Sequence, residues 1–156
     1  MIKKFILVVS FCLIAQASFG AGDGGSSTTE PDLYKEAKQL VYRAKKLEKK
    51  NKNDRAIKLY NEANKKLVEA NKKDKNNPDI LNYLGFTLRK MGKYDEAEKF
   101  YLSGLKIKPD HNGINEYLGE LYVKTKRMDL AKERLAALKG CKCEEYDELA
   151  EVINEK

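Results

Sequence analysis

The residues of this 156-residue chain best suited to chemistry are two cysteines separated by a single lysine, Cys141 and Cys143. They are the only cysteines after residue 20, and three interpretations stay open for them. The first is a local disulfide that locks a turn. The second is a strained, easily reduced pair with a redox or metal-handling role. The third is a bridge to another chain. Two cysteines without a nearby histidine make only half of a metal site, so structural pairing is favoured and no metal is assigned.

The remaining sequence offers little catalytic equipment. The single histidine, His111, stands in a polar turn beside Asp110 and Asn112, with no nucleophile or second ligand near it in sequence. We therefore expect an exposed turn histidine. The chain has no glycine-rich phosphate loop, metalloprotease helix motif or nucleophile elbow. These observations indicate a protein that is not an enzyme and needs no cofactor.

The start of the chain has the layout of a secretory signal peptide. Lys3 and Lys4 precede an apolar run over residues 5–15, and small residues permit cleavage after Ala17 or after Gly20. The run is shorter than the roughly 20 apolar residues that span a bilayer. We therefore expect a cleaved signal and not a membrane anchor, and a periplasmic or secreted protein.

The chain after the signal divides into a linker and one folded domain. Residues 1–20 are assigned to the signal peptide, and residues 21–30, rich in Gly, Ser and Thr, to a flexible linker. Residues 31–156 are long enough for one domain with a continuous core. No membrane-spanning segment is expected after cleavage.

Charge is distributed unevenly along the folded part. The whole chain has 31 basic and 24 acidic residues; segment 43–75 holds thirteen Lys/Arg against five Asp/Glu, and segment 144–156 holds six acids and one base. Export argues against nucleic acid as the partner of the basic segment. An anionic envelope surface in weak contact is a better candidate, and solvated helix faces are the simpler one. The opposite charges of the two segments also suggest salt-sensitive self-association.

A period of 34 residues organises the folded part. The pair Leu84-Gly85 recurs as Leu118-Gly119. Further residues recur at the same spacing, namely Ile80 and Ile114, Tyr83 and Tyr117, Leu88 and Tyr122, Asp95 and Asp129, Ala97 and Ala131, Tyr101 and Leu135. A period of this size is typical of stacked helical hairpins. Apolar steps of three and four residues inside each copy predict amphipathic helices.

The copy over residues 78–111 has signals for where its two helices start and stop. Asn77 suits an N-cap and Pro78 a first helical turn. Gly92 stands where the first helix must stop, and Pro109 ends the second. The segment is therefore predicted to form a helix–turn–helix unit.

This copy resembles a tetratricopeptide repeat. The resemblance lies in Leu84-Gly85, Leu88, Gly92, Tyr94-Asp95-Glu96-Ala97, Tyr101 and Pro109. It implies an all-α, right-handed superhelix of about three hairpins that binds a peptide or protein. The expected elements are a lengthened hairpin at 32–74, the full match at 78–111, a degenerate copy at 112–139 and a capping helix at 144–155. Residues expected to pack between helices are Leu84, Gly85, Ala97, Leu118, Gly119 and Ala131.

In this family the first helix of each hairpin lines a concave groove. The matching positions of the two clear copies are Asn82, Phe86, Arg89, Lys90, Glu116, Glu120, Val123 and Lys124. The first hairpin would add Val41, Lys45 and Glu48. The Lys and Asn set that holds a C-terminal carboxylate in chaperone-binding members is not reproduced. Two interpretations stay open for Phe86, as an apolar anchor in the groove or as a residue packed beneath the neighbouring helix.

Overall fold

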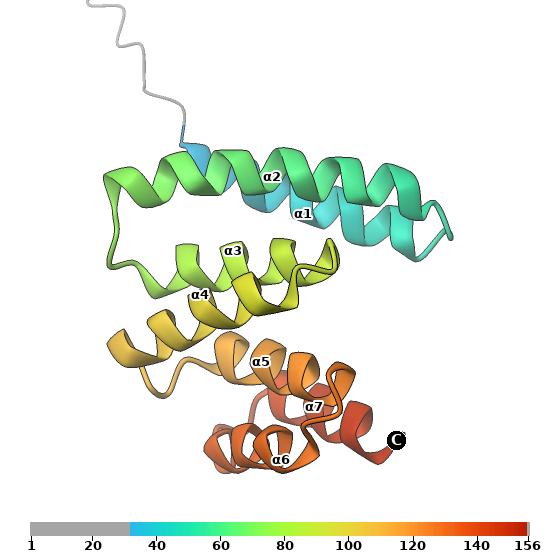
Figure 1. Cartoon of the computed structure of the whole chain (residues 1–156), viewed down its shortest axis with the longest axis vertical. Helices are drawn as coiled ribbons and strands as arrows, with labels where there is room; N and C mark the ends of the chain where they lie inside the picture. Colours follow the sequence, from blue (N-terminus) through green and yellow to red (C-terminus); the bar gives the residue numbers. More distant parts are fainter. Residues whose placement is uncertain (1–31, 156) are drawn as a thin grey trace, which may run out of the picture. The chain divides into compact units, whose positions relative to one another are not determined.

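The computed structural model describes residues 32–155, which contain seven α-helices and no strand (Figure 1). They are α1 (Leu33–Glu48), α2 (Asn53–Lys73), α3 (Pro78–Lys90), α4 (Tyr94–Ile107), α5 (Asn112–Lys124), α6 (Met128–Ala137) and α7 (Glu144–Asn154). The predicted all-α class is confirmed. The expected signal peptide and linker lie outside the described residues.

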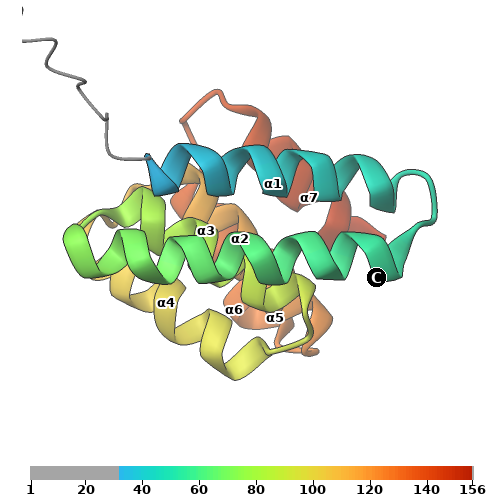
Figure 2. The ribbon, with the colours of Figure 1, turned by 90° about the horizontal axis from the view of Figure 1, so that it is seen from above.

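The helices pack in sequence order as three hairpins followed by a single helix. The closest pairs are α1 with α2, α3 with α4, and α5 with α6, and α7 packs against α5 and α6. Figure 2 shows α1 and α7 on one side of the stack and α4 and α6 on the other. Among helices of residues 32–155, none has the length and apolar character needed to cross a membrane.

The helix ends follow the local signals of the sequence. Asn77 accepts hydrogen bonds from the backbone N–H groups of Asp79 and Ile80 at 3.0 and 3.3 Å, so its predicted role as N-cap is confirmed. Gly92 adopts φ 78°, a left-handed conformation that favours glycine, and ends α3 as expected. Helix α4 ends at Ile107, just before Pro109.

Apolar faces of neighbouring hairpins form two buried clusters, one over residues 37–86 and one over residues 88–131, and partly buried side chains such as Tyr117 pack against both. In the first hairpin Tyr60 and Leu67 of α2 are fully buried, and in the second and third Leu84, Tyr101 and Leu118 are at most 1% exposed. Ala97 and Ala131 are fully buried too. This is the distribution expected when each hairpin covers the next one.

The two recurring glycines allow close approach of different helices. A Cβ atom added to Gly85 would lie 2.5 Å from the Tyr101 ring of α4, inside the same hairpin. A Cβ atom added to Gly119 would lie 2.5 Å from Leu149 of α7. Both distances are shorter than real packing permits, so a methyl group added at either position would force the neighbouring side chain to shift.

Candidate functional site

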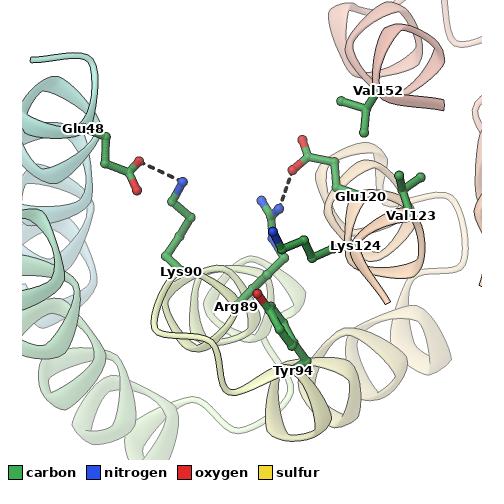
Figure 3. Close-up of a pocket in the computed structure, with 8 residues that line it drawn as sticks. All are labelled: Glu48, Arg89, Lys90, Tyr94, Glu120, Val123, Lys124 and Val152. Carbon is green, nitrogen blue, oxygen red and sulfur yellow. Dashed lines mark ion pairs between the residues drawn. The ribbon is translucent and has the colours of Figure 1, made fainter. Parts of the chain in front are cut away.

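A cleft opens where the inner faces of α1, α3 and α5 meet α7 (Figure 3). Its volume is about 340 Å³. The lining residues are Glu48, Arg89, Lys90, Tyr94, Glu120, Val123, Lys124 and Val152. We call this cleft the polar cavity.

Two ion pairs cross the polar cavity and tie three helices together (Figure 3). Lys90 of α3 lies 2.8 Å from Glu48 of α1, and Arg89 of α3 pairs with Glu120 of α5. Tyr60 of α2 also donates a hydrogen bond to Glu48 at 2.8 Å. The side chains of Arg89 and Glu120 are only 14% and 21% exposed, so solvent screens this pair less than a surface pair.

A second cavity of about 160 Å³ lies along the same helices and has aromatic walls. Its lining residues are Lys38, Val41, Tyr42, Lys45, Tyr83, Phe86 and Tyr117. The Phe86 ring is 4% exposed, with its centroid 4.9 Å from that of Tyr117 and 5.8 Å from that of Tyr60. Phe86 therefore packs in the core and also lines the cavity. We call this site the aromatic cavity.

Arg89 connects the two cavities. It lines the polar cavity, and its guanidinium carbon lies 5.5 Å from the Phe86 ring centroid and 5.4 Å from that of Tyr117, both of which line the aromatic cavity. Each of α1, α3 and α5 contributes residues to both cavities, about one helical turn apart. We refer to the two cavities together as the inner groove.

Three lysines give the inner groove a positive charge that its own acids do not neutralise. Lys38 and Lys45 line the aromatic cavity, and Lys124 lines the polar one. Within residues 32–155 no ion pair engages these three ammonium groups. Lys45 instead lies 5.6 Å from the Phe86 ring centroid, and Lys38 lies 5.2 Å from that of Tyr34. A cation near an aromatic face is held by a weak attraction and stays available to an anion.

Six of the eight groove residues expected from the second and third hairpins line the two cavities, and two do not. Phe86 lines the aromatic cavity, and the residues in the polar cavity are Arg89, Lys90, Glu120, Val123 and Lys124. Asn82 is 7% exposed and packs against Gly113 at the start of α5, and Glu116 is 2% exposed. Helix α7 is the reason for the burial of Glu116, since it packs on α5 and brings Glu148 into contact.

Glu116 is a buried acid surrounded by other acids. Burial, a hydrogen bond with Glu148 and the charges of Glu120, Glu148 and Glu145 raise the pKa of Glu116 to about 10. The carboxyl group is therefore neutral at pH 7. Its place is structural, at the contact between α5 and α7.

His111 is buried and capping, so the expectation of an exposed turn residue is wrong. The ring is 9% exposed, and its Nδ1 accepts a hydrogen bond from the backbone N–H of Ile114 at 3.2 Å. The proton therefore sits on Nε2, which lies 3.1 Å from Asp79 Oδ1 and donates to it. The histidine thus links the start of α5 to the start of α3.

Cys141 and Cys143 form a disulfide with Cα atoms 5.2 Å apart, immediately before α7. Cys143 is the N-cap residue of that helix. A cavity of about 190 Å³ lies beside it, lined by Leu138, Gly140, Lys142, Cys143, Tyr146 and Asp147. No group of three or more His, Cys, Asp or Glu within the described part of the chain could hold a metal ion.

The family model of the tetratricopeptide repeat matches residues 78–111. The central hairpin is a tetratricopeptide repeat. The match covers α3 and α4, which supply Phe86, Arg89 and Lys90 to the inner groove. No curated protein matches the chain in sequence.

Solved structures share the arrangement of this repeat and the hairpins around it. A tetratricopeptide repeat protein from Parabacteroides merdae is 14% identical with a TM-score of 0.55, and the match covers 78% of this chain and 60% of that one. The first repeat domain of Spaghetti (RPAP3), bound to the HSP90 peptide SRMEEVD, is 18% identical with a TM-score of 0.50, over 78% and 94% of the two chains. The Yersinia enterocolitica translocator chaperone SycD gives the same identity and score over 78% and 88%. At these identities the likeness shows the fold.

Proposed function

We propose that the chain is a non-enzymatic interaction module that binds a peptide or protein segment along the inner groove. The observation that carries the proposal is the pair of adjoining cavities on the inner faces of α1, α3 and α5. Repeat arrays characteristically use such concave faces to hold a partner. The Spaghetti repeat domain, which shares this fold, is bound to a peptide.

The lining of the groove favours a particular ligand chemistry. The aromatic cavity suits one apolar or aromatic side chain, since Tyr83, Phe86 and Tyr117 surround it. Lys38 and Lys45 at the same cavity would attract carboxylates on either side of that anchor. The expected ligand is therefore an acidic segment with one apolar anchor, in extended or helical form.

A peptide selection on the purified full chain tests this proposal. Random peptides displayed on phage should enrich acidic sequences with one apolar or aromatic residue. The affinity of the best peptide, measured by fluorescence anisotropy, should fall about tenfold or more in Lys45→Glu. The matched control is Lys65→Glu, the same charge reversal at an exposed position of α2. Enrichment of basic peptides, or equal losses in the two variants, would contradict the groove assignment.

We also propose that the protein acts in the bacterial cell envelope or outside the cell. The support is the signal-like layout of residues 1–20. Weak contact of segment 43–75 with anionic envelope surfaces and self-association through opposite charges stay predictions of the same kind.

A second candidate function rests on a separate observation. This candidate is a small thiol-redox or metal-handling protein that uses Cys141 and Cys143. Both sulfurs are paired within the protein, which argues against a bridge to another chain and fits either a structural lock or a redox role. This candidate is independent of the inner groove, and each is tested without the other.

A further inference from the structure

The disulfide before α7 closes a loop of only three residues, Cys141, Lys142 and Cys143. Building on the thiol-redox candidate above, we propose that this disulfide is an exchange site that accepts two electrons from the dithiol of another protein. Its features differ from those of a structural staple in three respects: the backbone it constrains, the position of its leaving sulfur, and its accessibility.

The closed loop holds Lys142 in an unfavourable backbone conformation. Its φ of 50° lies in the left-handed region, which residues with a Cβ atom rarely adopt. A disulfide that closes so short a loop also gains little from restricting the unfolded chain. The disulfide therefore imposes an unfavourable backbone conformation on Lys142 and stabilises the folded protein only weakly. Reduction lets Lys142 leave the left-handed region.

Cys143 is the better of the two leaving groups. It is the N-cap of α7, and its side chain makes no capping hydrogen bond while it is tied in the disulfide. A thiolate released there lies at the N-terminus of α7, where the backbone N–H groups of the first turn stabilise negative charge. The first turn also contains three acids, Glu144, Glu145 and Asp147, whose negative charges reduce this stabilisation of the thiolate.

The disulfide is accessible to a partner. Cys141 and Cys143 are each partly exposed, and Lys142 between them is exposed. The adjacent cavity of about 190 Å³ is lined by Leu138, Cys143 and Tyr146 among others, and it can receive a partner side chain beside the leaving sulfur.

The reaction balances with the partner dithiol as the only co-reactant. A partner thiolate attacks Cys141 Sγ, the S–S bond breaks, and its electron pair moves to Cys143 Sγ as a thiolate. The second partner thiolate then attacks the partner sulfur of the mixed disulfide and releases the Cys141 thiolate. The partner leaves as a disulfide, and the two cysteine thiolates take up the two protons that the partner thiols lost.

Equilibration of the full chain with glutathione buffers tests whether the backbone conformation of Lys142 destabilises the disulfide. The fraction of reduced protein is measured by thiol alkylation and mass spectrometry. Wild-type protein should pass from oxidised to reduced within the glutathione series. Lys142→Gly should shift the equilibrium about threefold to tenfold toward the disulfide, because glycine adopts positive φ without steric cost. Lys142→Ala, the matched control, keeps the Cβ atom and should not show this stabilisation.

Mapping of the first adduct tests the direction of attack. Brief reaction with reduced glutathione, acid quenching and peptide mass mapping should place glutathione on Cys141. A disulfide that stays oxidised in the most reducing glutathione buffer would overturn the proposal. So would adducts mainly on Cys143, or equal equilibria for the glycine and alanine variants.

Discussion

Gly85 and Gly119 occupy equivalent positions of the two repeat copies, yet the atoms that require them to be small differ. Gly85 faces the rigid ring of Tyr101, whereas Gly119 faces the flexible end of Leu149. The exchange of Tyr101 for Leu135 at the equivalent place of the second copy accompanies this difference. The recurring glycine therefore has a different packing partner in each of the two repeat copies.

Gly85→Ala should destabilise the protein, because the added methyl group cannot fit against the Tyr101 ring. Overpacking costs about 1–3 kcal/mol, and the higher helix propensity of alanine returns at most about 1 kcal/mol. Gly119→Ala should cost less, since the Leu149 side chain can change rotamer. Urea unfolding measures both, with Ser103→Ala at an exposed helix position as the control. A larger loss for Gly119→Ala would contradict the assignment.

Glu116→Gln should flatten the dependence of stability on pH. The raised pKa of about 10 means that the folded protein keeps a proton on Glu116 that the unfolded chain loses near its ordinary pKa. Wild-type stability therefore falls as pH rises between these two values, by up to about 1.4 kcal/mol per pH unit from this group. Glutamine keeps a neutral donor and removes this slope. Urea unfolding at pH 5, 7 and 9 gives the free energy of unfolding of wild type and of Glu116→Gln. If the two proteins show the same dependence of this free energy on pH, Glu116 is not a buried neutral acid.

At the scale of the elements, the start of α5 depends on a contact with another hairpin. His111 caps α5 and bonds to Asp79 in the first turn of α3. Asn115 of α5 also donates a hydrogen bond to the Pro109 carbonyl oxygen at 3.0 Å. The junction between the second and third hairpins is therefore held by polar groups as well as by the core.

His111→Ala should lower the free energy of unfolding by about 1–2 kcal/mol, because it removes the cap and leaves the Ile114 N–H without its acceptor. His111→Asn can still cap α5 but cannot reach Asp79 in the same way, so it should recover part of the loss. Thermal unfolding followed by circular dichroism measures both variants. Equal stability of wild type and the alanine variant would show that the contact contributes nothing.

The elements were predictable from the sequence, and the contacts between distant elements were not. Apolar periodicity, the N-cap Asn77 and the terminating Gly92 indicate where helices begin and end, because these signals act within a few residues. The burial of Glu116 depends on α7, about thirty residues later, and a pattern on α5 alone carries no sign of that cover. His111 is similar, since histidine is not a favoured cap and its partner Asp79 lies 32 residues away.

At the scale of the whole molecule, the sequence predicts that the protein is exported and that its signal peptide is removed. Protein recovered from cells should begin after Ala17 or after Gly20, and intact-mass spectrometry of the purified chain distinguishes the two. Val8→Asp should block this processing by placing a charge in the apolar run. Val68→Asp, the same change on an exposed site of α2, should leave it unaffected. Recovery of wild-type protein with its first 20 residues intact would contradict the signal assignment.

The ion pairs across the polar cavity make Glu48 and Glu120 tethered competitors of any anionic ligand. An incoming carboxylate gains Arg89 or Lys90 only by displacing a carboxylate of the protein itself, which is present at a high effective concentration. Such a swap leaves the number of ion pairs unchanged, so added salt should affect it little. Selectivity at this end of the inner groove would then depend on the shape of the ligand and on the new contacts that the displaced Glu48 or Glu120 carboxylate can make. Lys38 and Lys45 provide the salt-sensitive attraction for an acidic ligand.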